Sequence, residues 1–146
     1  EGVSLTPTVR SECGRVETIV LVGEYDGTRS DIETASPMSI LHVRMKPSTD
    51  AETPSTWTIN LPRSFQTAIV YMRTGSATVL SNSQRDEIPT HHTATISPSG
   101  TTLRLEAHGD DGADFLLLAG EPIREVVEAR GSMVMSTPGE IDAAYR

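Results

Sequence analysis

The sequence predicts an all-β domain of the sandwich or barrel type, and three observations support this prediction. Short runs rich in β-branched or alternating apolar residues recur between residues 17 and 119. Glycine and proline, 11 and 9 of the 146 residues, separate these runs at close spacing. A helix-start signal occurs only in the C-terminal tail. Many short strands with such turns are typical of β-sandwiches and barrels.

Five strands are predicted before residue 81, and turn residues end most of them. In the second of these runs, His42 and Arg44 share the face opposite to the apolar residues, because side chains alternate along a strand. We expect residues 77–80 to form a hairpin with residues 68–73 across Gly75. The five predicted strands are residues 17–22, 39–45, 56–61, 68–73 and 77–80.

The second half of the chain adds three strands and one helix, with a polar loop over residues 81–86. Residues 115–119 are apolar on both faces, which predicts a fully buried strand. Thr137 is a predicted N-cap because Pro138 follows it and Glu140 lies three residues later. The three predicted strands are residues 93–96, 102–107 and 115–119, with turns at residues 97–100 and 110–112.

Composition narrows the functional classes. The formal net charge is −8 and the sequence pI is near 4.9, which argues against binding of nucleic acid through a basic face and against a basic membrane-surface helix. No apolar run approaches the roughly 18 residues of a membrane span. Cys13 is the single cysteine, so no internal disulfide framework exists, and a reducing, intracellular compartment is predicted.

The beginning of the chain predicts that this polypeptide is part of a longer one. Glu1 is not a natural initiator, and the first residues are polar and contain Pro7. The first convincing strand starts only near Val16.

Three stretches of the sequence resemble the pirin family, specifically the second of its two cupin barrels. The first runs from Gly23 through Pro37 to Met45, and the second covers residues 61–75. The third starts at Leu116 and continues to Ile141. The motif residues that carry the resemblance most clearly, and to which we assign a structural role, are Gly23, Glu24, Tyr25, Asp26, Gly27, Ser36, Pro37, Gly120, Glu121 and Pro122.

The sequence departs from the family pattern in its tail. Pirins usually have Pro in place of Val126, Gly-Pro-Phe in place of residues 131–133, and Asn in place of Ser136. These changes fall in the segment that packs back toward the first barrel in the family. We expect these changes to alter the details of that contact and to leave the fold unchanged.

The resemblance implies a cupin double-stranded β-helix within a two-barrel (bicupin) protein. Residues 1–15 would be an interdomain segment, residues 16–120 the C-terminal cupin barrel, and residues 121–146 a helix-containing tail that packs toward the N-terminal barrel. In the family the first barrel holds one iron on three histidines and one glutamate. The implied activities are quercetin dioxygenase chemistry and iron-dependent coregulation of transcription factors, which implies a cytoplasmic or nuclear location.

We expect this chain to hold no metal or other cofactor, and the iron to lie in the N-terminal barrel. A cupin site needs a His-x-His pair on one strand, because residues two apart share a face. His91 and His92 are adjacent, and His42 and His108 both have the pattern of outward, solvated residues. A surface site formed by His91 and His92 with Asp86 or Glu87 is the weaker alternative.

Other reactive groups have simpler structural interpretations. Cys13 is interpreted as an ordinary unpaired cysteine, and the acidic run at residues 110–114 as a hairpin turn, because it lacks the ligand order of a calcium loop. Glu24 and Asp26 fit a loop at the barrel edge. Glu121 is expected to tie the tail to the barrel by charge-assisted hydrogen bonds.

Three functions remain open. The first is a structural and interaction half that packs against an iron-bearing barrel and presents an acidic surface to protein partners such as transcription factors. The second is a supporting half of a quercetin 2,3-dioxygenase-type enzyme. The third is a generic β-sandwich ligand-binding module, which the aromatic content of 4% disfavours. If the tail covers another barrel, the isolated chain exposes an apolar strip and should self-associate; the strip comprises Val126, Val127, Met133, Val134 and Met135.

Overall fold

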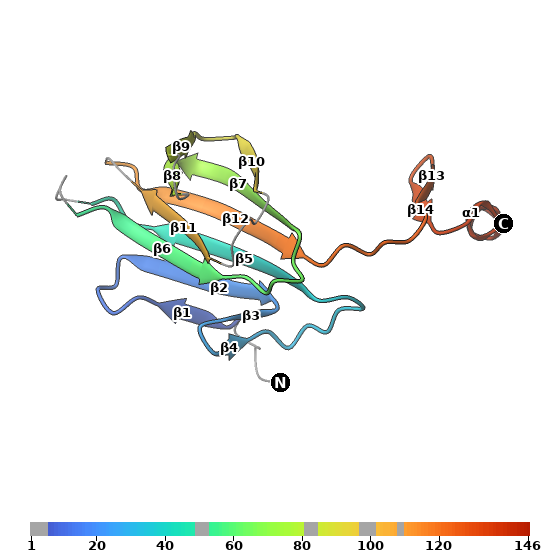
Figure 1. Cartoon of the computed structure of the whole chain (residues 1–146), viewed down its shortest axis with the longest axis horizontal. Helices are drawn as coiled ribbons and strands as arrows, with labels where there is room; N and C mark the ends of the chain where they lie inside the picture. The colour runs from blue at the N-terminus through green and yellow to red at the C-terminus, as the bar shows by residue number, and fades with distance from the viewer. Residues whose placement is uncertain (1–5, 49–52, 81–84, 97–101, 108–109) are drawn as a thin grey trace.

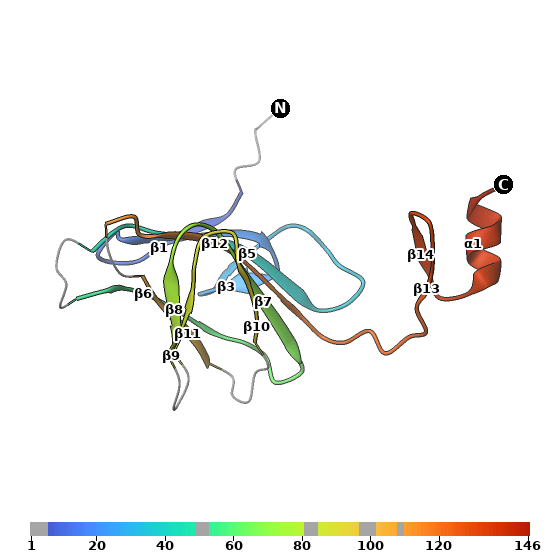
Figure 2. The ribbon, with the colours of Figure 1, turned by 90° about the horizontal axis from the view of Figure 1, so that it is seen from above.

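The computed structural model describes residues 6–48, 53–80, 85–96, 102–107 and 110–146. Within these residues the chain forms fourteen strands and one short helix, so the all-β class with a helix-containing tail is confirmed. Two sheets face each other as a sandwich and do not close into a single barrel (Figures 1 and 2). No helix among the described residues has the length and apolar character needed to cross a membrane.

The larger sheet has six strands, and every pair of neighbours is antiparallel. Its central strands are the apolar runs that the sequence predicted, while the edge strand β1 lies in the segment predicted to link two domains. In spatial order the strands are β1 (Thr8–Arg10), β2 (Val16–Val22), β5 (Met38–Met45), β12 (Ala113–Gly120), β7 (Thr67–Gly75) and β10 (Thr93–Ile96).

The smaller sheet has four antiparallel strands and covers one face of the larger sheet. Two separate hairpins lie outside the two sheets, one at the edge of the sandwich and one in the tail. The smaller sheet runs in the order β6 (Ser55–Asn60), β11 (Thr102–Ala107), β8 (Ala77–Leu80) and β9 (Arg85–Ile88), and the hairpins are β3 (Glu24–Tyr25) with β4 (Thr28–Arg29) and β13 (Glu128–Arg130) with β14 (Met133–Met135).

The predicted hairpin between residues 68–73 and 77–80 is wrong. Strand β7 pairs with β10 and β12, whereas β8 pairs with β9 and β11 in the other sheet. Gly75 has a φ of +72°, and the chain passes from one sheet to the other there. Alternation along a strand identifies its buried face but does not identify the sheet to which it belongs.

The core lies between the two sheets and is aliphatic with a few aromatic anchors. Trp57 of β6 is 1% exposed and contacts Phe115 of β12 edge-to-face, with ring centroids 5.4 Å apart. The indole nitrogen donates a 3.0 Å hydrogen bond to the hydroxyl of Thr18 on β2. These contacts connect the two sheets through their largest buried side chain.

Strand β12 is central in its sheet, but the prediction that it is fully buried is wrong. Phe115, Leu117 and Ala119 face the core, whereas Leu116 is half-buried and Leu118 is 39% exposed on the opposite face. The smaller sheet covers only one face of the larger sheet, so the outer face of β12 lies open despite its apolar side chains.

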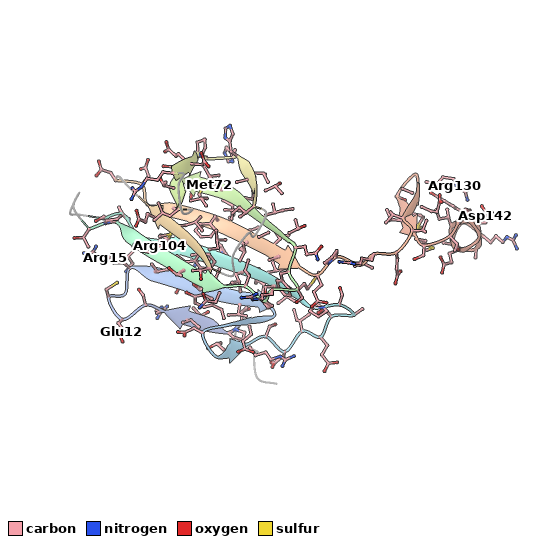
Figure 3. The ribbon with its side chains drawn as sticks, viewed as in Figure 1. Glu12, Arg15, Met72, Arg104, Arg130 and Asp142 are labelled. Carbon is pink, nitrogen blue, oxygen red and sulfur yellow. The ribbon has the colours of Figure 1, made fainter. Side chains whose placement is uncertain are left out.

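The tail leaves the sandwich after β12 as an extended arm, which we define as residues 121–146 (Figure 1). Its end is a small folded unit of the β13–β14 hairpin and α1 (Pro138–Ala144), with the predicted capping box of Thr137 and Glu140 present. Arg130 forms an ion pair with Asp142, and both lie far from the sandwich in Figure 3. Ile141 is the buried residue of this unit.

Candidate functional site

His42 faces outward from β5, as predicted, but it is 9% exposed and therefore not solvated. Its register partners on the two neighbouring strands are Ile19 and Leu116, which flank the ring. The Nε2 atom of His42 lies 2.9 Å from Oδ1 of Asp114 and 3.0 Å from Nη1 of Arg73. The outward orientation was correct and the solvent exposure was wrong, because neighbours in a wide sheet cover the imidazole.

The other histidines do not join His42. His91 and His92 are exposed at the turn between β9 and β10, where His91 has a φ of +62°. His108 lies outside the described residues. Among the described residues, no group of three or more His, Cys, Asp or Glu side chains is arranged to hold a metal ion.

The motif at residues 23–27 forms the first strand and the two-residue loop of a hairpin at one edge of the sandwich. Glu24 pairs with Arg29, and Asp26 and Gly27 both have positive φ, 48° and 73°. Two consecutive positive φ angles are typical of a type I′ turn. The backbone twist of this turn matches the right-handed twist of the two strands that it connects. Gly23 precedes the hairpin, and an added Cβ there would lie 2.6 Å from the carbonyl oxygen of Met38.

The other motif residues meet this hairpin at the same end of the sandwich. The backbone N–H of Glu121 donates a 3.1 Å hydrogen bond to the carbonyl of Pro37, and Ser36 and Pro122 lie beside these two residues in the chain. Gly120 ends β12 opposite Met38. The main chain at Glu121 therefore ties the arm to the sandwich, and the charge-assisted bond of the Glu121 carboxylate stays a prediction.

Six of the ten motif residues line an open cleft of about 1030 Å³, which we call the end cleft; they are Gly23, Glu24, Tyr25, Asp26, Pro37 and Glu121. One wall is the β3–β4 hairpin with residues 32–39, and the other is the end of β6 with residues 61–65. The buried side chains of Leu61 and Phe65 contribute apolar surface. A volume of this size lies at the upper end of the range for clefts that bind small molecules.

Tyr25 connects the end cleft to the core. Its ring stacks on Trp57 with centroids 5.7 Å apart, and its hydroxyl donates a 3.2 Å hydrogen bond to the carbonyl of Thr58. Burial of this hydroxyl raises the pKa of Tyr25, so the phenol keeps its proton and remains a donor near neutral pH. The motif tyrosine thus fixes the hairpin against β6.

The outer face of the larger sheet is the second candidate site, and no sequence prediction identified it. Its apolar residues come from four adjacent strands and lie in two neighbouring rows across the sheet. The signal was present in the sequence, because residues 115–119 are apolar on both faces. We define this apolar outer face as Ile19, Ile40, Ile69, Tyr71, Leu116 and Leu118.

A network of charged groups borders the apolar outer face. Asp114 accepts from Arg73 at 3.2 Å, and Arg44 joins Glu17 at 3.2 Å. Arg10 contacts the other oxygen of Glu17 at 2.8 Å. This hydrogen bond from Arg10, assisted by Arg44, lowers the pKa of Glu17, so the carboxylate stays charged at neutral pH.

Cys13 is exposed in the turn before β2, and its Sγ lies 3.4 Å from the hydroxyl oxygen of Ser11. The hydrogen bond with Ser11 lowers the pKa of the Cys13 thiol. The described histidines bond elsewhere or lie at the turn before β10, and no hydrogen bond within the described residues joins one of them to this pair.

The chain matches the model of a known protein family. The model of the pirin C-terminal cupin domain matches residues 41–146. Pirin-1 of Arabidopsis thaliana is 30% identical over 138 residues, which is 93% of this chain and 45% of that protein. Human pirin is 30% identical over 129 residues, which is 88% of this chain and 42% of that protein. The chain thus spans less than half the length of these relatives.

Solved structures share the fold. A crystal structure titled quercetin 2,3-dioxygenase from Acinetobacter baumannii superposes with a TM-score of 0.80 at 24% identity, covering 96% of this chain and 44% of that one. A Geobacillus kaustophilus protein superposes with a TM-score of 0.66 at 20% identity, covering 82% of this chain and 45% of that one. The sandwich and the gathered motif residues agree with the family match, and the chain belongs to the pirin family, as its C-terminal cupin domain.

Proposed function

We propose that this chain is the metal-free half of a two-barrel pirin-like protein, and that it packs its apolar outer face and its arm against an iron-bearing barrel. The observation that carries the proposal is the contrast between the two sheets. The larger sheet presents aliphatic and aromatic side chains outward, whereas the outer face of β6 and β11 carries polar residues such as Thr58, Asn60 and Arg104. A sheet face that meets water is normally polar.

The arm supports the same role. It extends away from the sandwich, and four of its aliphatic side chains are 65–72% exposed. Several exposed aliphatic side chains on one short segment are an expected feature of an interaction site. The four residues are Ile123, Val126, Val127 and Val134, whereas Met133 and Met135 of the predicted strip are half-buried.

The positions of the described histidines support the metal-free assignment. Of the three described histidines, His42 is engaged with Asp114 on the outer face, and His91 and His92 lie at an exposed turn. The core between the sheets is apolar apart from a few hydroxyl groups such as Thr18. Residues that share no interior position cannot complete an octahedral or tetrahedral site.

A second candidate function is support of an oxygenase, because a structural neighbour is titled quercetin 2,3-dioxygenase. In that case iron in the companion barrel supplies the chemistry, and this chain holds the companion in place. Coregulation of transcription factors would use the same scaffold with an outer surface that is acidic overall, since the net charge is −8.

Thiol labelling tests the packing proposal. Leu118→Cys and Thr58→Cys, each in a Cys13→Ser background, are made in this chain and in a longer polypeptide that includes the first barrel. We expect Leu118→Cys to react rapidly in this chain and at least about tenfold more slowly in the longer protein, as expected for a buried interface. Thr58→Cys should react equally in both. Equal labelling of Leu118→Cys in both proteins would contradict the packing.

Iron content and oxygen consumption with a flavonol separate the two functions. We expect neither from this chain alone. A longer protein that holds iron and consumes oxygen supports the oxygenase, and one that holds iron without oxygen consumption supports the interaction role. Stoichiometric iron in this chain alone would overturn the metal-free assignment.

A further inference from the structure

Strand β6 has an open edge beside the end cleft. It pairs with β11 on one side only and is the first strand of its sheet. The carbonyl of Thr58 accepts from the Tyr25 hydroxyl and therefore points away from β11. In an antiparallel strand the N–H and C=O of one residue point to the same side, and this side alternates along the chain. The same edge thus carries the N–H of Thr58 and both backbone groups of Asn60.

These backbone groups border the cleft on the side of β6 away from β11. Outside the ladder with β11, the Tyr25 hydroxyl is the one group in the described part of the chain seen to bond to the backbone of Thr58 or Asn60. Thr58, Asn60 and Leu61 all line the end cleft. An unpaired strand edge is a template for another extended segment, and here it lies in a groove rather than on a flat surface.

The side chains around the groove define the chemistry of the occupant. Four carboxylates line the end cleft against the single guanidinium of Arg29. Ile32 is 60% exposed and Met38 is 36% exposed, so the groove also offers apolar contacts. An extended segment in which lysine or arginine alternates with aliphatic residues matches both features, because alternate side chains point to opposite faces. The carboxylates belong to Glu24, Asp26, Glu33 and Glu121.

The arm of a second copy matches the groove poorly. Its extended part, residues 121–127, carries Glu121 and Glu125 against Arg124. That segment would bring further negative charge to an acidic groove. Charge complementarity therefore favours a different protein as the source of the segment.

We propose that the end cleft binds an extended basic segment of a partner protein, which adds to the edge of β6 as a further strand. Backbone hydrogen bonds to Thr58 and Asn60 would set the register, and the four carboxylates would select basic side chains. This site is separate from the apolar outer face, because none of the residues that line it belongs to that face. If this binding proposal fails, the packing proposal is unaffected, because the thiol labelling at Leu118 measures a different surface.

Fluorescence anisotropy with a labelled peptide of alternating lysine and valine tests the proposal on the full chain. We expect saturable binding, and no measurable binding of the matched glutamate–valine peptide. A third peptide carries N-methyl groups on alternate residues, which removes the donors from one edge while keeping the charge. It should bind at least about tenfold more weakly if strand addition contributes the hydrogen bonds. Equal binding of the methylated peptide would overturn the strand geometry.

Charge-reversal variants locate the site. Glu33→Lys lies in the cleft, whereas Asp111→Lys lies at the turn before β12, at the opposite end of that strand. We expect Glu33→Lys to weaken binding about tenfold and Asp111→Lys to change it less than about twofold. Equal weakening by both variants, or no binding by the unmodified chain, would overturn the assignment. Unfolding curves of both variants verify that each is folded.

Discussion

The indole nitrogen of Trp57 donates a 3.0 Å hydrogen bond to the hydroxyl of Thr18, and each residue is 1% exposed. The bond connects β6 of the smaller sheet to β2 of the larger sheet. A buried indole N–H is costly when it lacks an acceptor. Thr18 therefore allows a large, partly polar side chain to occupy the centre of a core that contains few aromatic residues.

We expect Thr18→Val to lower the free energy of unfolding by about 1–3 kcal/mol, because the buried N–H of Trp57 loses its acceptor while the packed volume is kept. Urea denaturation measures the change. The matched experiment makes Thr18→Val in a Trp57→Phe background, where no N–H remains and the cost should nearly vanish. Equal costs in both backgrounds would show that this hydrogen bond contributes nothing.

The sequence predicted the strands that bury an alternating face, and it missed those that do not. Strands β5 and β11 follow clear alternation, whereas β3, β4 and β9 are short and mostly exposed, so hydrophobic patterning cannot reveal them. The helix start at Thr137 was found because capping is a local interaction. The crossing at Gly75 was missed because the choice of sheet depends on distant partners.

The candidate sites were predictable only in part. The motif residues were identified through the family resemblance, but the cleft that six of them line was not, because residues 23–26, Pro37 and Glu121 come together only in the folded chain. The burial of His42 was missed for a similar reason, since Asp114 and Arg73 reach it from two other strands. Residues 115–119 are apolar on both faces, and this pattern was interpreted as burial within this domain. It reflects the apolar outer face instead.

We expect Gly23→Ala to destabilise the domain by more than Gly27→Ala. Both glycines have positive φ, 86° and 73°, so an added Cβ introduces backbone strain of about 1–3 kcal/mol at either position. At Gly23 the Cβ would also lie 2.6 Å from the carbonyl oxygen of Met38, whereas at Gly27 nothing lies within 4 Å. Denaturation midpoints of the two variants measure the difference. A larger loss at Gly27 would contradict the close approach of the hairpin to β5.

We expect Glu17 to stabilise the fold at neutral pH by about 0.2–1 kcal/mol relative to Glu17→Gln, as is usual for partly exposed ion pairs. Arg10 lowers the pKa of Glu17 in the folded state, and Arg44 contributes. A lowered folded pKa gives stability that is present above the ordinary glutamate pKa of about 4.3 and is lost as the pH falls below it. The free energies of unfolding of the parent and of Glu17→Gln should therefore converge as the pH falls. Denaturation of both proteins across the acidic range measures this.

Glu87→Gln is the control for Glu17→Gln. Glu87 is exposed on β9 and makes no ion pair within the described part of the chain. Its variant reports the effect of replacing an exposed carboxylate that has no ion-pair partner in the described part of the chain. If the Glu17→Gln difference does not change with pH, then the Arg10–Glu17–Arg44 network adds no stability.

The apolar outer face predicts that this chain self-associates when no companion barrel covers it. Leu118 is 39% exposed near the centre of the face, with Ile40 and Ile69 as its register partners. Apolar area exposed in this way is removed from water when two copies pair. We expect light scattering to give a mass above that of the 15.7 kDa monomer, and Leu118→Asp to shift the equilibrium toward the monomer by at least about tenfold.

Two controls separate the outer face from other causes of association. Thr58→Asp places the same charge on the outer face of the smaller sheet and should leave the mass unchanged. Val127→Asp introduces the charge on the arm, where the parent side chain is 72% exposed, and reports whether the arm takes part in the contact. A compact monomer for the unmodified chain would show that the outer face tolerates water, and the packing proposal would then lose its main support.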